Sequence, residues 1–177
     1  MRLNGEATEL WYRVARQYLT LRGAALGLSF ERDMATVIQV VIDCADPARL
    51  AEFWASALGY ALQEPPTGYT SWPEFLTAQG IPESEWNSAN AVVDPEGRGP
   101  RLFFQRVPEP KTVKNRVHLD LNVSGGPSTP LDTRRERVNA EVARLEQIGA
   151  SQQRVGEQRG EYWIVMRDPE GNDFCVQ

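Results

Sequence analysis

The chain of 177 residues contains a single histidine, His118, and only two cysteines, Cys44 and Cys175. One histidine excludes a two-histidine zinc site within one chain, and two cysteines are too few for a disulfide scaffold. No stretch approaches the roughly 18–20 apolar residues of a membrane span, and no secretory signal pattern opens the chain. The net charge of −5 gives no basic footprint for nucleic acid. We therefore expect a cytoplasmic protein that binds neither nucleic acid nor a membrane.

What the chain does contain is an ordinary globular composition, with 41% apolar and 24% charged residues. A chain of this length buries a sizeable core without help from disulfides or metals. Residues 1–34 differ from the rest and read as an N-terminal helical extension. Its apolar residues recur at helical spacing: Leu10, Val14, Tyr18, Leu21 and Ala25. Such a helix packs on the domain, frays in solvent or forms a dimer.

An internal repeat organises residues 35–177. The tetrapeptide Asp-Pro-Glu-Gly occurs at 94–97 and again at 168–171, and each copy lies between two short apolar runs. Because Pro presets one φ angle and Gly accepts a positive one, this tetrapeptide predicts a turn. Each copy therefore predicts a β-hairpin.

The segments upstream of the two turns also match. Residues 37–44 and 116–123 predict strands, and each is followed by a helix pattern that ends at a glycine, Gly59 or Gly149. Asp46 and Pro47 supply an N-cap and a first helical residue, and Thr133 with Glu136 suggests a capping box for the second helix. The sequence thus predicts β-α-β-β-β twice, as module one over 35–110 and module two over 114–177.

Module one carries an excursion over 65–90 between its second and third strands. It contains the aromatic residues Trp72, Phe75 and Trp86 and several prolines. Long loops of this kind in compact domains often serve as lids or binding walls. The alternative is a loop that only covers the edge of the sheet.

The ordered motifs resemble those of the vicinal oxygen chelate (VOC) superfamily, most closely its glyoxalase-like branch. The resemblance covers residues 35–177 and rests on three segments: Leu50–Trp54 with Leu58 and Gly59, Phe104–Asp120, and Asp168–Cys175. It implies an α+β fold of two tandem βαβββ modules whose mixed sheets curve into a cup, as in glyoxalase, bleomycin resistance and dihydroxybiphenyl dioxygenase proteins. The resemblance further implies a small-molecule ligand, in many members a divalent metal, and often a homodimer.

The resemblance also implies where a metal would be held, with two ligands from each module. The corresponding positions here are Gln39, Phe103, His118 and Cys175. Phenylalanine cannot ligate, an amide is a weak donor, and a thiolate is soft where relatives use a carboxylate. Gln105, two residues after Phe103, is a substitute on the same strand face. The candidate metal ligands Gln39, His118 and Cys175 therefore form an incomplete set.

His118 has a second interpretation as a catalytic residue. Asp120 lies two residues further along the same strand and shares its face, so it can orient the imidazole and form a general base with it. The other candidates line the cup as ligand-binding residues: Gln39, Trp72, Phe104 and Gln105.

Three functions remain open from the sequence. The first is a glyoxalase-like small-molecule-binding protein of unassigned reaction without a complete catalytic metal site. The second is a metal-dependent VOC enzyme, such as a lyase, isomerase or dioxygenase. The third is a metal-free protein that sequesters a drug or toxin, for which the aromatic excursion is an argument.

Overall fold

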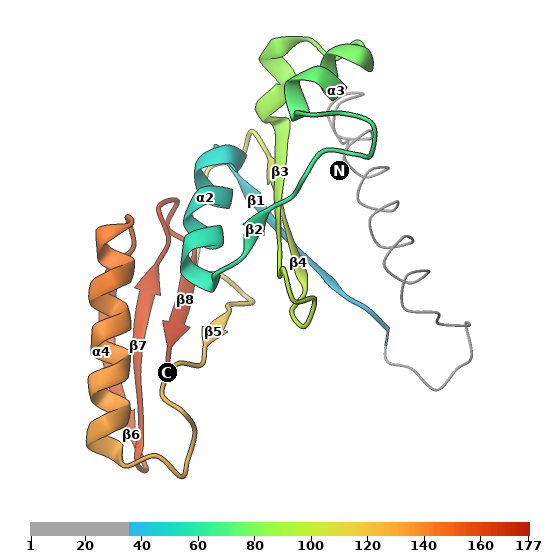
Figure 1. The fold of residues 1–177 in the computed structure, drawn as a ribbon. Helices are drawn as coiled ribbons and strands as arrows, with labels where there is room; N and C mark the ends of the chain where they lie inside the picture. Colours follow the sequence, from blue (N-terminus) through green and yellow to red (C-terminus); the bar gives the residue numbers. More distant parts are fainter. Residues whose placement is uncertain (1–35) are drawn as a thin grey trace. The chain divides into compact units, whose positions relative to one another are not determined.

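The structure is a computed structural model that describes residues 36–177 (Figure 1). The expected helix over residues 1–34 lies outside the described residues. The described chain forms two compact units. The first unit contains residues 36–51 and 61–106, and the second contains residues 52–60 and 107–177.

The first unit is built on a four-stranded mixed sheet in the order β1-β4-β3-β2. Strand β1 runs parallel to β4, and the other neighbours are antiparallel. The strands are β1 (Gln39–Cys44), β2 (Ala61–Leu62), β3 (Ala89–Val93) and β4 (Arg101–Arg106). The first Asp-Pro-Glu-Gly turn joins β3 to β4, so the predicted hairpin is confirmed.

Helix α2 (Pro47–Leu58) begins and ends where the sequence predicted. The Asp46 carboxylate accepts the backbone N–H of Arg49 at 3.3 Å, as an N-cap does. Asn87 donates to the same carboxylate, and this hydrogen bond lowers the pKa of Asp46. After the helix, Gly59 has a φ of +67°, which allows the chain to turn back at little cost.

The excursion over 65–90 is not an open loop, because it folds into α3 (Trp72–Ala78) and the 3-10 helix η1 (Glu83–Ser88). Figure 1 shows these helices, in green, at one end of β3. Phe75, Leu76 and Ile81 form a small core of their own, and three further aromatic residues pack against it: Tyr69, Trp72 and Trp86. Ser71 caps α3 by accepting the N–H of Glu74.

The second unit repeats the sheet pattern in the order β5-β8-β7-β6. Its strands are β5 (Asp120–Leu121), β6 (Ser151–Gln158), β7 (Glu161–Arg167) and β8 (Asp173–Val176). Strand β5 is parallel to β8, and the other neighbours are antiparallel. The α+β fold with two βαβββ-like modules is therefore confirmed.

Helix α4 (Leu131–Gln147) covers one face of this second sheet (Figure 1). Alternate strand residues, such as Ile164, Met166 and Phe174, are buried together with Val138 and Leu145 of the helix. The expected capping box of Thr133 and Glu136 is wrong, because the N-cap is Pro130, three residues before Thr133, and it makes no side-chain cap.

The C-terminal half of α2 completes the core of the second unit. Phe53 and Trp54 each pack edge-on against Phe174 of β8, with ring centroids 6.2 and 5.3 Å away. The indole N–H of Trp54 donates to the buried Asp168 carboxylate at 3.3 Å. Helix α2 is thus divided between the units, its first residues belonging to one and its later residues to the other.

Among residues 36–177, no helix has the length and apolar character needed to cross a membrane.

Candidate functional site

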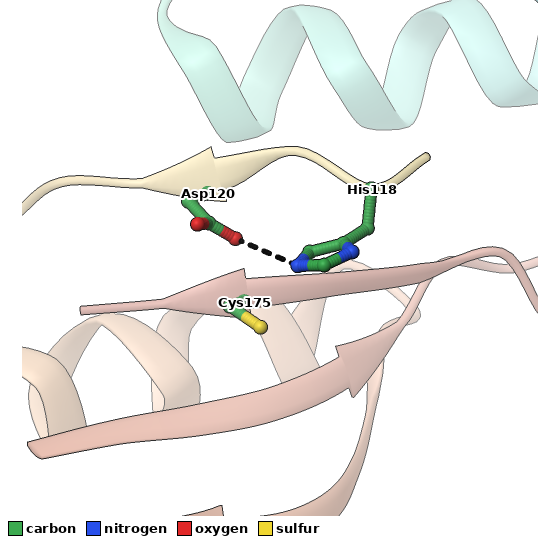
Figure 2. A group of neighbouring side chains, drawn as sticks. All are labelled: His118, Asp120 and Cys175. Carbon is green, nitrogen blue, oxygen red and sulfur yellow. Dashed lines mark ion pairs between the residues drawn. The ribbon is translucent and has the colours of Figure 1, made fainter. Parts of the chain in front are cut away.

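Three side chains of the second unit converge on the sheet face that α4 leaves uncovered. His118 precedes β5, Asp120 opens β5, and Cys175 lies directly opposite Asp120 on β8. Their donor atoms all lie within 4.8 Å of one another. Figure 2 shows the imidazole reaching toward both the Asp120 carboxylate and the Cys175 sulfur.

His118 and Asp120 form a direct pair. The imidazole Nε2 lies 3.4 Å from Asp120 Oδ1, and the two side chains are 44% and 40% exposed. Since a carboxylate at Nε2 favours the tautomer with a proton there, Nδ1 becomes the proton acceptor. The pairing expected from the alternation of the strand is therefore present in the structure.

Cys175 is partly buried and remains a thiol at neutral pH. Burial raises its pKa to about 11, and the neighbouring Asp120 carboxylate adds to the rise because it repels a second negative charge. A protonated thiol is a poor nucleophile and must lose its proton before it can bind a metal.

The first unit holds different residues at the corresponding positions. If the Asp120–Cys175 pair is matched to Val41–Phe103, which is also a parallel pair, then Gln39 takes the position of His118. This register agrees with the alignment made from the sequence. In place of ligands, the first unit has the amide of Gln39, the aliphatic side chain of Val41 and the completely buried ring of Phe103.

Beside Gln39 lies a buried cation, Arg101, which is only 2% exposed. Its Nη1 donates to Gln39 Oε1 at 2.6 Å, and its Nε donates to Gln63 Oε1 at 2.7 Å. The guanidinium also lies 5.0 Å from the centre of the Phe103 ring, within the range of a cation–π contact. The amide oxygen of Gln39 is therefore engaged by an arginine.

The remaining candidates of the first unit lie on or beneath the same sheet. Trp72 packs against Ala89, Ala91 and Phe103, and its indole N–H donates to the Gln63 carbonyl at 2.7 Å. Gln105 is buried on the Phe103 side of β4, whereas Phe104 is buried on the opposite side, because neighbouring strand residues alternate.

These residues do not fit a divalent metal held by two ligands from each module. Phe103 offers no donor atom, Gln39 is engaged by Arg101, and the positive charge of Arg101 repels a metal cation. The second unit alone offers one nitrogen, one oxygen and one sulfur donor.

Two residues were missed by the sequence reasoning. Arg101 follows the two-residue insertion after the first turn, and a charged residue at the start of a strand is usually exposed, so nothing marked it as buried. Trp163 stands within the apolar run Tyr162–Met166, which by itself predicts only a strand. Its signal was a glycine on the neighbouring strand, Gly156, which leaves room for a large ring.

The two sheets and their helices define a fold class, the α+β proteins built from tandem βαβββ modules. A family model of the glyoxalase-like domain matches residues 39–177. The chain therefore belongs to the glyoxalase-like family of the VOC superfamily. No curated protein matches the chain.

Solved structures support the same fold. A glyoxalase/bleomycin resistance protein/dioxygenase family enzyme from Burkholderia phytofirmans PsJN has 15% identity and a TM-score of 0.51, covering 80% of this chain and 97% of its own. A possible glyoxalase from Bacillus cereus has 14% identity and a TM-score of 0.51, covering 81% and 99%.

A third structure carries a metal. The fosfomycin resistance protein FosX from Listeria monocytogenes, in a mutant form complexed with Mn(II) and 1S,2S-dihydroxypropylphosphonic acid, has 9% identity and a TM-score of 0.52, covering 81% of this chain and 90% of its own. At these identities the likeness shows the fold alone.

Proposed function

We propose that this protein binds a small organic molecule, uses His118 and Asp120 as its acid–base pair and works without the complete metal site of its metal-dependent relatives. The observation that carries the proposal is the hydrogen bond from Arg101 to Gln39 at 2.6 Å. Gln39 is one of the positions from which a metal would need a ligand. Its amide oxygen is engaged instead by the Arg101 guanidinium, which is always positively charged.

The His118–Asp120 pair supports a role in proton transfer. Asp120 holds one imidazole nitrogen at 3.4 Å, so the other nitrogen can accept a proton from a bound molecule. Both side chains are exposed enough for a ligand to reach them. Cys175 contributes a neutral thiol beside the pair, because its raised pKa keeps the sulfur protonated at neutral pH.

Metal analysis of the full chain tests the first part of the proposal. Protein purified without chelator is expected to contain far less than one equivalent of any transition metal, and calorimetric titration with Mn²⁺, Ni²⁺ or Zn²⁺ is expected to show no tight site. One tightly held metal per chain would overturn it.

The second part is tested with a panel of small organic acids, aldehydes and phenols, by calorimetry for binding and by chromatography for turnover. His118→Gln and Asp120→Asn are expected to abolish turnover of a bound compound while its affinity changes little. Asn122→Ala is the matched control, because Asn122 lies two residues beyond Asp120 and is exposed. Turnover that survives both substitutions would refute the acid–base role.

A second candidate is a metal enzyme that uses the second unit only. The three donors His118, Asp120 and Cys175, all within 4.8 Å, favour it, and this mixture of nitrogen, oxygen and sulfur suits a zinc-like ion. It predicts that the purified protein holds one equivalent of zinc and that Cys175→Ser weakens zinc binding. The same metal analysis would detect both results.

A further inference from the structure

One row of residues crosses all four strands of the second sheet. Asp120 of β5 lies opposite Cys175, which lies opposite Val165, which lies opposite Arg154 of β6. Residues directly opposite each other share a sheet face. Arg154 therefore lies on the same face as the His118–Asp120 pair.

A β-bulge places Arg154 on this face. The pairing runs from Gln152 opposite Met166 to Arg154 opposite Val165, so one residue of β6 is extra. Without the bulge, Arg154 would occupy the face covered by α4, since strand residues alternate.

Two residues beyond Arg154, Gly156 lies opposite Trp163 of β7. A Cβ at Gly156 would lie only 2.2, 2.4 and 2.6 Å from Cε2, Cζ2 and Nε1 of Trp163. Three atoms of one indole at such similar distances mean that the ring lies across the glycine backbone. Only glycine leaves space for this arrangement, and the indole remains partly exposed.

Arg154 is an available cation beside this ring. Four other arginines of the second unit bind carboxylates: Arg134, Arg135, Arg144 and Arg167. Arg154 is exposed and, among residues 36–177, has no carboxylate partner. It is a diagonal neighbour of Trp163, and such pairs lie within reach of long side chains. Within the same described residues, the Trp163 indole N–H also has no hydrogen-bond acceptor.

From this juxtaposition we infer that the ligand of the proposed function is an aromatic anion, whose ring stacks on Trp163 and whose anionic group binds Arg154. An exposed indole face offers stacking, and a guanidinium offers a bidentate site for a carboxylate. Strands β5 and β6 are three strand spacings apart, roughly 14 Å. A ligand that also reaches His118 and Asp120 is therefore about two rings long. This inference rests on the proposed function and narrows it to a substrate class.

Isothermal titration calorimetry of the full chain tests the inference, with 2-naphthoate as the probe. Calorimetry is preferable to fluorescence because replacing Trp163 would remove the signal itself. Trp163→Leu and Arg154→Gln are each expected to weaken binding by about tenfold or more. The neutral analogue 2-naphthamide should bind wild type correspondingly more weakly. Arg159→Gln is the matched control, because Arg159 is an exposed arginine in the turn after β6, and it should bind like wild type.

Unchanged 2-naphthoate affinity in Trp163→Leu, or equal affinity for acid and amide, would overturn the inference. Circular dichroism melting identifies a variant that fails to fold. If Trp163→Leu does not fold, Trp163→Phe replaces it, and the expected loss of 2-naphthoate affinity is smaller because an aromatic ring remains. If aliphatic acids bind and are turned over with dependence on His118 while 2-naphthoate does not bind, the substrate class is wrong and the proposed function stands. If no compound of the wider panel binds the folded protein, the proposed function fails as well.

Discussion

Replacing Asp168 by asparagine should destabilise the protein by an amount that its hydrogen bonds define. Asp168 Oδ1 accepts the backbone N–H groups of Glu170 and Asn172, at 3.0 and 2.9 Å. Oδ2 accepts the Trp54 indole N–H at 3.3 Å and the Asn172 side-chain amide at 2.9 Å. In Asp168→Asn the first oxygen remains, but an NH₂ group then faces two donors.

Each buried donor left without an acceptor costs about 1–3 kcal/mol, which gives roughly 2–6 kcal/mol in all. Burial raises the pKa of Asp168, so the wild-type carboxylate itself costs some stability, and removing the charge offsets part of the loss. We expect a net loss of about 2–3 kcal/mol at pH 7. Urea unfolding followed by circular dichroism measures it. A loss below about 0.5 kcal/mol would refute the reasoning.

The repeat supplies its own control, because Asp94 occupies the same place in the first turn. Asp94 accepts three backbone N–H groups, chiefly that of Gly99, and these lower its pKa, whereas burial raises that of Asp168. The stability from Asp94 is present above its unfolded pKa of 3.8 and is lost as the pH falls below it. The contribution of Asp168 is greatest below 3.8 and declines as the pH rises through its folded pKa. The loss in Asp168→Asn should therefore grow from pH 7 toward pH 4, whereas the loss in Asp94→Asn should stay nearly constant over this range and shrink only below pH 3.8. The same trend in both variants would contradict this account.

Further predictions concern single residues of the second unit and the start of α2. Because the pKa of Cys175 is about 11 and that of an ordinary thiol is 9.0, iodoacetamide should alkylate Cys175 at pH 7–8 about 100-fold more slowly than a free thiol. Asp120→Asn should speed the reaction, and a rate plateau near pH 8–9 by intact mass spectrometry would show that the pKa is not raised. Gly156→Val should lower the unfolding free energy by about 1–3 kcal/mol, since its side chain would displace the Trp163 indole; an unchanged urea midpoint would contradict that contact. Asp46→Ala should cost about 0.5–2 kcal/mol through the lost N-cap. A loss within error would mean that Asn87, whose Oδ1 accepts the backbone N–H of Ala48 at 2.9 Å, caps the helix alone.

The regular elements were predictable because their signals are local. The Asp-Pro-Glu-Gly turns fix their own backbone angles, and Asp46 with Pro47 begins α2 by contacts within one helical turn. The start of α4 was not predictable in the same way. Its first turn begins at Leu131 after Pro130, and no side-chain hydrogen bond caps it, so no capping residue marks the start in the sequence.

The candidate site was predictable only where it depends on alternation along one strand. His118 and Asp120 are two residues apart, so their shared face follows from the sequence. The burial of Arg101 depends on Gln39, which is 62 residues earlier in the chain. The position of Arg154 depends on a bulge, and a bulge leaves no clear mark on a polar strand. Contacts between segments that are far apart in the sequence depend on how the strands pair in the folded sheet, so one segment alone does not predict them.

The division of α2 has a consequence for dissecting the gene. A fragment starting at module two, residue 114, would contain the whole second repeat but would lack Phe53 and Trp54. It would lose the two aromatic rings that pack on Phe174 and the donor that binds Asp168. A synthetic peptide spanning α2 should therefore restore order to such a fragment, as in enzymes reconstituted from complementary halves.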